Sequence, residues 1–447
     1  MKKERRSVID FERSKEVRIK RANTDWWINE KAVVGDNGRT YIVYITDMGE
    51  VHIKELDTKC SKTPSRDYRL SRLNCTYADE HNAPSVCILS SGRILVAYTG
   101  HTADRCVRYR ITEKPYDISS FGPEKEIPTG GLTAYAQVFE NTEKKQIWLF
   151  TRVDRTTWRF TYSADEGESW SEAKPFLISD GGGLFYLSMH KLDVLKPYER
   201  NPHGTEEQFF FAVYGHPTSS GDHTIRTGIF NADGQLLQTD GTPLDMNLFA
   251  GNVIDLQKLD IVYSSPEGTT VRLLEVSATM PLRVGFAPFT VEKGKLPDPT
   301  LPAYHSATFR DGKWHISKPI CPAGEFLADV FDGAHTYLGG LAYYYGVGEA
   351  GLCPWVPAPT CTNRIYIARF DGKDRVLESY LSTDLGESYQ LEQVIRRIPS
   401  EKNVKIWRPT VPVYAQDNMP VYWYEGVYTA HTGGWHSDIA MYVEYDD

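Results

Sequence analysis

The sequence predicts an all-β protein, a single seven-bladed β-propeller, on three observations. Short β-rich runs recur along all 447 residues, for example at 41–46, 146–152 and 420–426, while helical periodicity is almost absent. These runs fall into about seven similar units, and sheets that radiate around an axis leave few exposed strand edges. Aromatic residues make up 12% of the chain, which favours strands.

Each predicted unit contains a short apolar strand, a turn, a long aromatic strand and a third strand that ends in a polar turn. The units are expected to start near Lys31, His81, Tyr135, Phe185, Gly251, Tyr337 and Trp407. No Pro/Ser-rich linker separates a second domain. We therefore expect residues 1–447 to form one domain, with residues 1–25 as an N-terminal tail or closing segment.

Two segments share one turn signature. Residues 163–170 read SADEGESW and residues 382–389 read STDLGESY. In each, the aspartate can bond amides of its own turn, the glycine can take a positive φ, and the last aromatic can pack beneath the hairpin. These segments resemble Asp-boxes, the turns between outer strands of sialidase-like propeller blades. Because they lie away from the axis, they predict the fold and not the reaction.

Charge and hydropathy exclude several classes of partner. The net charge is −9, and no Lys/Arg run flanked by aromatics follows the N-terminal tail, so a nucleic-acid partner is not expected. No apolar run approaches the ~20 residues of a membrane span. The basic N-terminus lacks the apolar stretch of ~7–15 residues found in secretory signals. The chain is expected to be cytoplasmic as written, or secreted or periplasmic if a leader was removed.

The cysteines offer one candidate metal site. Seven cysteines, an odd number, are scattered and do not resemble a disulfide framework. Cys321, Cys353 and Cys361 with His335 could form a tetrahedral zinc site, but no CxxC pair is present, so packed free thiols are the preferred interpretation. A structural metal stays open as an alternative.

Candidate catalytic residues come from the parts of two adjacent units that approach the axis. His81-Asn82 opens the second unit and His101 ends its second strand, so one hairpin can send both histidines to the same side. Tyr135 opens the third unit, and Arg152 ends its long strand in the place that His101 holds one unit earlier. Taken singly, each could be a satisfied core side chain or a surface ion pair. Their equivalence in the repeat predicts that the four meet.

These residue types suit β-elimination from a uronic acid, in which the proton on C5 is removed and the group on C4 departs. An arginine facing the carboxylate would stabilise the developing enolate-like charge. A neutral histidine or an ionised tyrosine can take the proton, and a tyrosine or second histidine can deliver one to the departing oxygen. This chemistry requires no metal or organic cofactor.

A family resemblance points the same way. The segments that carry it are HNAPSVCILSSGRILVAYTGH at 81–101, DISSFGPE at 117–124, AYAQV at 134–138, FAVYGHP at 211–217, FRDGKW at 309–314, YLGGLAY at 337–343 and WRP at 407–409. In this order they resemble the BNR-repeat family, which includes ulvan lyases and related rhamnose–glucuronate lyases and rhamnosidases. The resemblance runs from about residue 75 to the C-terminus.

The resemblance implies an acidic polysaccharide or oligosaccharide substrate. It assigns the chemistry to His81, His101, Tyr135 and Arg152. It assigns substrate contacts to Asn82, Tyr214, His216 and Arg408. Two departures affect these contacts: the third unit reads AYAQ where the family commonly has a proline after the tyrosine, and the GLCPWVPAPTCTN insertion has no counterpart in the family pattern.

The leading hypothesis is a polysaccharide lyase that cleaves a uronic-acid-containing, rhamnose–glucuronate glycan such as ulvan. One alternative is a glycoside hydrolase of the rhamnosidase or sialidase type on the same propeller. A sialidase is the less favoured hydrolase, because VRIKRA at 17–22 lacks the Arg-Ile-Pro signature that supplies its first arginine. The other alternative is a non-catalytic carbohydrate-binding propeller, in which the aromatics would be stacking platforms.

Overall fold

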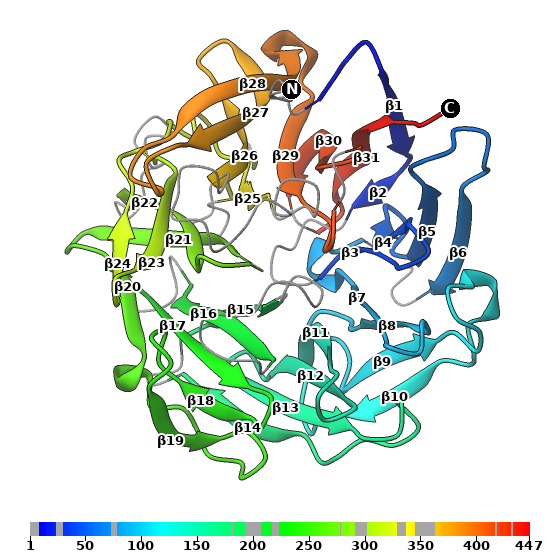
Figure 1. The fold of residues 1–447 in the computed structure, drawn as a ribbon, viewed down its shortest axis with the longest axis vertical. Coiled ribbons are helices and arrows are strands. Elements are labelled where there is room, and N and C mark those ends of the chain that lie inside the picture. The colour runs from blue at the N-terminus through cyan, green and yellow to red at the C-terminus, as the bar shows by residue number, and fades with distance from the viewer. Residues whose placement is uncertain are drawn as a thin grey trace, which may run out of the picture.

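Seven β-sheets follow one another around one axis in chain order (Figure 1). The computed structural model describes residues 9–23, 30–72, 78–179, 183–192, 207–216, 223–277, 279–290, 302–328, 337–344, 363–415, 418–430 and 432–447. Strand order within a sheet is mostly sequential, as in β7-β8-β9-β10, which is the pattern of a propeller blade. The predicted seven-bladed β-propeller is confirmed. No helix among the described residues is long and apolar enough to cross a membrane.

The blades are numbered from the N-terminus by their inner strands. Blade 1 contains β2 Ala22–Asn23, β3 Ala32–Val34, β4 Arg39–Thr46, β5 Val51–Asp57 and β6 Arg66–Ser71. Blade 2 contains β7 Ser85–Ile88, β8 Ile94–Tyr98, β9 Cys106–Ile111 and β10 Lys125–Pro128. Blade 3 contains β11 Thr133–Asn141, β12 Gln146–Val153, β13 Thr157–Ser163 and β14 Lys174–Ile178.

The remaining blades complete the ring. Blade 4 contains β15 Phe185–Leu192, β16 Gln208–Gly215, β17 Thr224–Asn231, β18 Gln235–Leu237, β19 Pro243–Asn247 and β20 Asp260–Ser264. Blade 5 contains β21 Thr269–Val276, β22 Arg283–Thr290, β23 His305–Arg310 and β24 Lys313–Ile316. Blade 6 contains β25 Leu341–Tyr343, β26 Asn363–Phe370, β27 Asp374–Ser382 and β28 Gln390–Pro399. Blade 7 contains β29 Lys405–Thr410, β30 Tyr422–Ala430, β31 Gly434–Glu444 and β1 Ser14–Ile19. Short 3-10 helices are η1 Glu80–Asn82, η2 Ile118–Ser120, η3 Leu256–Lys258 and η4 Ser400–Lys402.

The hydrophobic core lies between neighbouring blades. The second strands of the blades are apolar on both faces because a blade packs on each side of them: β8 and β16 are buried at every position, whereas the outer strand β6 is buried at one position of six. Between blades 3 and 4 the Trp148 ring stacks on Phe209 with centroids 4.6 Å apart. Buried apolar side chains thus hold neighbouring blades against each other. Polar side chains occupy the ends of the inner strands.

The N-terminal strand closes the ring. β1 pairs antiparallel with β31 along its whole length, so the first strand of the chain forms the outer edge of the last blade. At the inner side, the amide of Val34 in blade 1 donates to the carbonyl of Val413 at 2.9 Å, and the Val413 amide donates to Ala32. The first strand of the chain thus completes blade 7, and backbone bonds at the inner side join blade 7 to blade 1.

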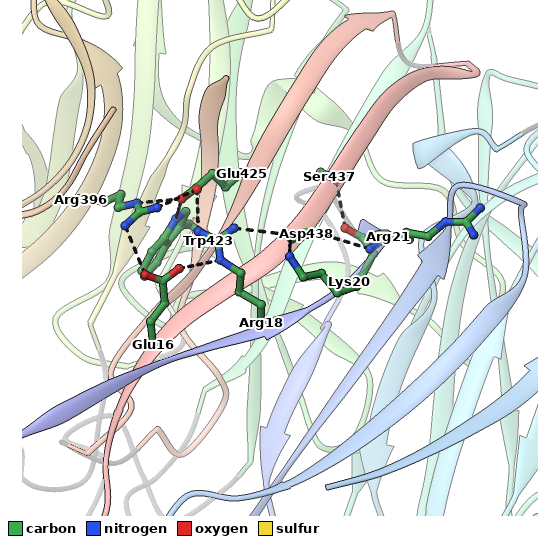
Figure 2. A network of polar contacts seen from close by, with 10 residues as sticks. Glu16, Arg18, Lys20, Arg21, Arg396, Trp423, Glu425, Ser437 and Asp438 are labelled. Carbon is green, nitrogen blue, oxygen red and sulfur yellow. Dashed lines mark hydrogen bonds and ion pairs between the residues drawn. The ribbon is translucent and has the colours of Figure 1, made fainter. Parts of the chain in front are cut away.

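Figure 2 shows a polar network that ties β1 to blades 6 and 7. At its centre the Glu425 carboxylate accepts from Arg18 of β1 at 2.6 Å and from Arg396 of β28 at 2.8 Å. Glu16 bonds both arginines, at 2.6 and 3.3 Å. Burial would raise the pKa of Glu425, but the two guanidinium groups outweigh it and lower the pKa. These ion pairs compensate the cost of burying the carboxylate.

One predicted repeat boundary is wrong. The fifth unit was expected to start near Gly251, but the inner strand of blade 5 is β21, which begins at Thr269. The difference arises because the hairpin β18–β19 and the strand β20, which pairs with β17, extend the fourth sheet to six strands. Gly251 lies in the turn after β19 with φ +75°. The other predicted starts lie next to inner strands.

The two segments with the shared turn signature adopt the same local structure. Asp165, between β13 and β14, accepts a hydrogen bond from the Ser169 amide at 2.9 Å, and Gly167 has φ +87°. The Ser169 hydroxyl and amide lower the pKa of Asp165 to about 2. Residues 382–389, between β27 and β28, repeat this bond at 2.9 Å and this φ of +87°. Both turns lie on the outer side of their blades.

Candidate active site

The four predicted catalytic residues lie at one end of blades 2 and 3. His81 belongs to η1, directly before β7, and His101 follows β8, which is antiparallel to β7. Tyr135 is near the start of β11, and Arg152 is near the end of β12, opposite Ala134. In both blades these positions are the start of the inner strand and the end of its neighbour. The structure brings the four side chains together.

The two histidines are stacked on each other over one carboxylate. Their ring centroids are 4.4 Å apart and the ring planes differ by 11°. Asp79 Oδ1 lies 2.7 Å from Nδ1 of His81, and Asp79 Oδ2 lies 3.0 Å from Nδ1 of His101. The His101 amide donates to Asn82 Oδ1 at 2.6 Å, so Asn82, predicted to contact substrate, holds the second histidine in place.

Asp79 carries the negative charge of this cluster. Burial would raise the pKa of Asp79, but the neighbouring imidazoles of His81 and His101 outweigh it and hold the pKa well below its usual range. Asp79, His81 and His101 are also the one group of His, Cys, Asp and Glu side chains, among the described residues, that is compact enough to hold a metal ion. Since both Nδ1 atoms already bond the carboxylate, a metal bound there would have to replace these hydrogen bonds.

Tyr135 is held in an unusual backbone conformation. Its φ is +64°, and it sits at a β-bulge where the pairing of β11 with β12 shifts between Ala134 and Ala136. A positive φ is rare for a bulky residue, and such strain and bulges are concentrated at functional sites, where they redirect a side chain. The Tyr135 ring lies 5.8 Å from the ring of His101. Burial raises the pKa of Tyr135 well above its usual value, against the opposing charge of Arg152, so the hydroxyl stays protonated at neutral pH.

Arg152 is a buried cation between two tyrosine rings. Its guanidinium carbon lies 4.5 Å from the ring centroid of Tyr135 and 5.3 Å from that of Tyr186, and the residue is 2% exposed. Within the described residues no carboxylate pairs with it, and its Nε and Nη1 atoms make no hydrogen bond. A buried charge costs several kcal/mol unless it is paired. The arrangement is therefore suited to an anionic group from outside the protein.

The other predicted substrate contacts lie around the same end of the molecule. Tyr214 is the second-last residue of β16 and His216 follows the strand, and their rings are 5.4 and 5.7 Å from that of Tyr186. Arg408 lies in β29 with φ +45°, at a position where β29 and β30 lose register. Burial raises the pKa of Tyr214, and the positive charges of Arg272 and Arg408 oppose this rise. Blades 4, 5 and 7 thus contribute buried polar groups to the same region.

Sequence reasoning missed Asp79, Tyr186, Arg272 and Tyr337 as members of this cluster. Tyr337 places its hydroxyl 3.3 Å from Nε2 of His81, and Arg272 lies 4.7 Å from the centroid of the Tyr337 ring. Two signals were available. Asp79 precedes His81 by two residues, and Tyr186 is the second residue of β15, close to the place that Tyr135 holds in β11.

The predicted zinc site falls largely outside the described residues. Cys353, Cys361 and His335 are among those that the structure does not describe. Cys321 is a buried free thiol, and burial raises its pKa to about 12.

Comparison with known proteins gives a family. Residues 39–279, more than half of the chain, match the family described as "BNR repeat-containing family member". The chain belongs to this family. No curated protein sequence matches this BNR-repeat protein.

Solved structures share the fold of this BNR-repeat protein. A PL25 ulvan lyase bound to -[GlcA(1-4)Rha3S]- is 15% identical, with a TM-score of 0.64 over 96% of each chain. The polysaccharide lyase Uly1 is 12% identical, with a TM-score of 0.54 over 94% of this chain and 90% of that chain. At these identities the likeness shows the fold alone.

Proposed function

We propose that this protein is a polysaccharide lyase that cleaves a uronic-acid-containing glycan, of the ulvan-like rhamnose–glucuronate kind, by β-elimination. The observation that carries the proposal is Arg152: a buried guanidinium, without a carboxylate partner among the described residues, next to a tyrosine and a stacked histidine pair. A uronate carboxylate would supply the missing anion and would place its own C5 beside the bases. The fold shared with an ulvan lyase and with a second polysaccharide lyase adds support.

In the proposed reaction His101 takes the proton from C5. Asp79 accepts from Nδ1 of His101, so a neutral His101 presents the lone pair of Nε2, and this atom makes no hydrogen bond with a described residue. The His101 side chain is 21% exposed, against 5% for His81. His101 is therefore the more accessible of the two bases.

Arg152 and Tyr135 complete the elimination. Arg152 pairs with the uronate carboxylate and stabilises the negative charge that develops on it as the C5 proton leaves. The electron pair of the C5–H bond forms the C4=C5 double bond, and the C4–O bond breaks. The Tyr135 hydroxyl, whose pKa burial raises further above neutrality, donates its proton to the departing oxygen. A proton returned from His101 to Tyr135 restores the starting state.

A glycoside hydrolase is the second candidate, and one observation favours it. A cavity of about 220 Å³ lies at the opposite end of the inner strands of blades 1 to 3, and carboxylates, among them Glu30 and Glu140, line it. Paired carboxylates are the usual catalysts of glycoside hydrolysis. However, Glu30 is bonded to His190, and Glu140 accepts from the amide and hydroxyl of Ser90. These bonds give both carboxylates a structural role, so the lyase is preferred.

Incubation with ulvan and with rhamnose–glucuronate oligosaccharides tests the proposal. A lyase generates the ultraviolet absorbance of a 4,5-unsaturated uronate, a hydrolase generates reducing ends without this chromophore, and a binding protein generates neither. We expect the chromophore. Reducing ends in its absence would replace the lyase by the hydrolase.

A further inference from the structure

One buried carboxylate serves both histidines of the candidate active site. The two oxygens of Asp79 face the two Nδ1 atoms, at 2.7 Å for His81 and 3.0 Å for His101. An ionised carboxylate can only accept hydrogen bonds, so both Nδ1 atoms must carry hydrogen. In the neutral imidazole the acceptor is then Nε2, on the far side of each ring. The two rings are stacked within 11° of parallel, and each turns its Nδ1 edge toward the same carboxylate, which leaves both Nε2 atoms without a contact to Asp79.

Asp79 is itself firmly held. It pairs with Thr432 of blade 7 in an isolated β-bridge, and the carbonyl of the preceding Ala78 accepts from the Gly433 amide at 2.7 Å. Its Oδ1 also accepts from the His81 amide at 3.0 Å, which caps η1. The following Glu80 accepts from the Tyr428 hydroxyl at 2.7 Å. Contacts with blade 7 thus fix the carboxylate under the histidines of blade 2.

We propose that Asp79 is a positioning residue that fixes His81 and His101 in one tautomer, with hydrogen on Nδ1, and so presents both Nε2 atoms to the substrate. The chemistry assigned to these atoms rests on the proposed lyase function. The tautomers themselves do not, because they follow from the hydrogen bonds of Asp79 alone.

The two Nε2 atoms then have different tasks. Nε2 of His81 lies 3.3 Å from the Tyr337 hydroxyl and can accept from it, so His81 and Tyr337 form a hydrogen-bonded pair. Nε2 of His101 makes no such bond within the described part of the chain, and it is the base for C5. Asp79 therefore supports one reacting histidine and one that holds Tyr337, and both need the same tautomer.

Asp79→Asn is the variant that separates these tasks. The amide has the shape of the carboxylate, but its oxygen can accept from only one imidazole and its NH₂ group must donate to the other. The second imidazole is then forced to carry hydrogen on Nε2. A matched control is Asp255→Asn, because Asp255 caps η3 through the same bond, to the Gln257 amide at 3.0 Å, and touches no histidine.

Nitrogen NMR of protein labelled at its 12 histidines reads the tautomers directly, with His81→Gln and His101→Gln variants to assign the two signals. In the unmodified protein we expect hydrogen on Nδ1 of both. In Asp79→Asn we expect one of the two to change tautomer, and kcat for uronate elimination to fall about 10²–10⁴-fold with little change in KM. Asp255→Asn should retain both tautomers and full turnover.

A neutral His81 or His101 with its hydrogen on Nε2 and not on Nδ1 in the unmodified protein would overturn the proposal without the use of any variant. So would unchanged tautomers or full turnover in a folded Asp79→Asn protein. If the unmodified protein forms no unsaturated uronate from any glycan, the lyase proposal fails, but the NMR measurement still decides whether Asp79 fixes the tautomers.

Discussion

Arg152→Lys tests the role assigned to the buried guanidinium. Lysine keeps the positive charge but loses the planar fork that can bind a carboxylate at two points. Removal of one preorganised donor to a developing oxyanion costs about 2.7–4 kcal/mol, or 10²–10³-fold in kcat. Since lysine retains the charge, we expect the lower end, a fall of about 10²-fold in kcat. KM should change little, because the interaction strengthens as charge develops on the carboxylate.

Steady-state elimination, followed by ultraviolet absorbance over a range of substrate concentrations, gives kcat and KM separately. Arg283→Lys is the matched control. Arg283 is also 2% exposed, and its guanidinium lies 4.5 Å from the centroid of the Tyr343 ring, but it is at the opposite end of its blade, where β22 begins. Loss of stacking affects both variants equally, whereas loss of the fork should affect turnover only at Arg152. Equal effects on kcat in the two variants would refute the reasoning.

Three further predictions concern single side chains. Tyr135→Phe should lower kcat by at least about 10²-fold and leave substrate binding intact, because it removes the proposed proton donor; near-normal elimination would transfer this role to the histidines. Glu425→Gln should lower the free energy of unfolding in urea by about 2–3 kcal/mol, since it removes the buried one of the two carboxylates that Arg18 and Arg396 share; an unchanged midpoint would contradict this. His190, bonded to the buried Glu30 and the partly buried Glu275, has its pKa raised from 6.5 to about 10 by their charges, against the opposing effect of burial. Its stabilisation is therefore complete below pH 6.5 and lost as the pH rises through 10. The difference in unfolding free energy between wild type and His190→Gln should shrink by on the order of 4 kcal/mol over this range, and a constant difference would refute the assignment.

Repetition made the propeller and the four central residues predictable. His101 and Arg152 hold equivalent places at the end of the second strand in blades 2 and 3. His81 and Tyr135 likewise lie at the start of the inner strand in these two blades. The sequence alone could therefore place all four side chains at one end of the molecule. The sixth strand of blade 4 broke the period, and the start predicted at Gly251 was wrong for this reason. Local repetition thus misplaced the start of the blade that follows the two added strands of the fourth sheet.

Contacts across the axis could not be predicted from one sequence. Glu30 bonds His190 over 160 positions of the chain, and Tyr337 reaches His81 over 256. Such pairs depend on how the blades are placed around the ring, and no local pattern marks them. Asp79 is the exception, because it lies only two residues before His81. An aspartate at this spacing can cap a short turn that contains the histidine, and this pattern is visible in the sequence.

The most direct test of the central claim is the mass balance of cleavage. Mass spectrometry of a defined rhamnose–glucuronate oligosaccharide, before and after incubation with the protein, shows whether a water molecule is consumed. Elimination predicts two fragments whose masses add up to that of the substrate, with an unsaturated uronate at the new non-reducing end, and about one hundredth as much product from Arg152→Lys at matched early times. Fragments whose summed mass exceeds that of the substrate by one water would contradict elimination and would identify a hydrolase.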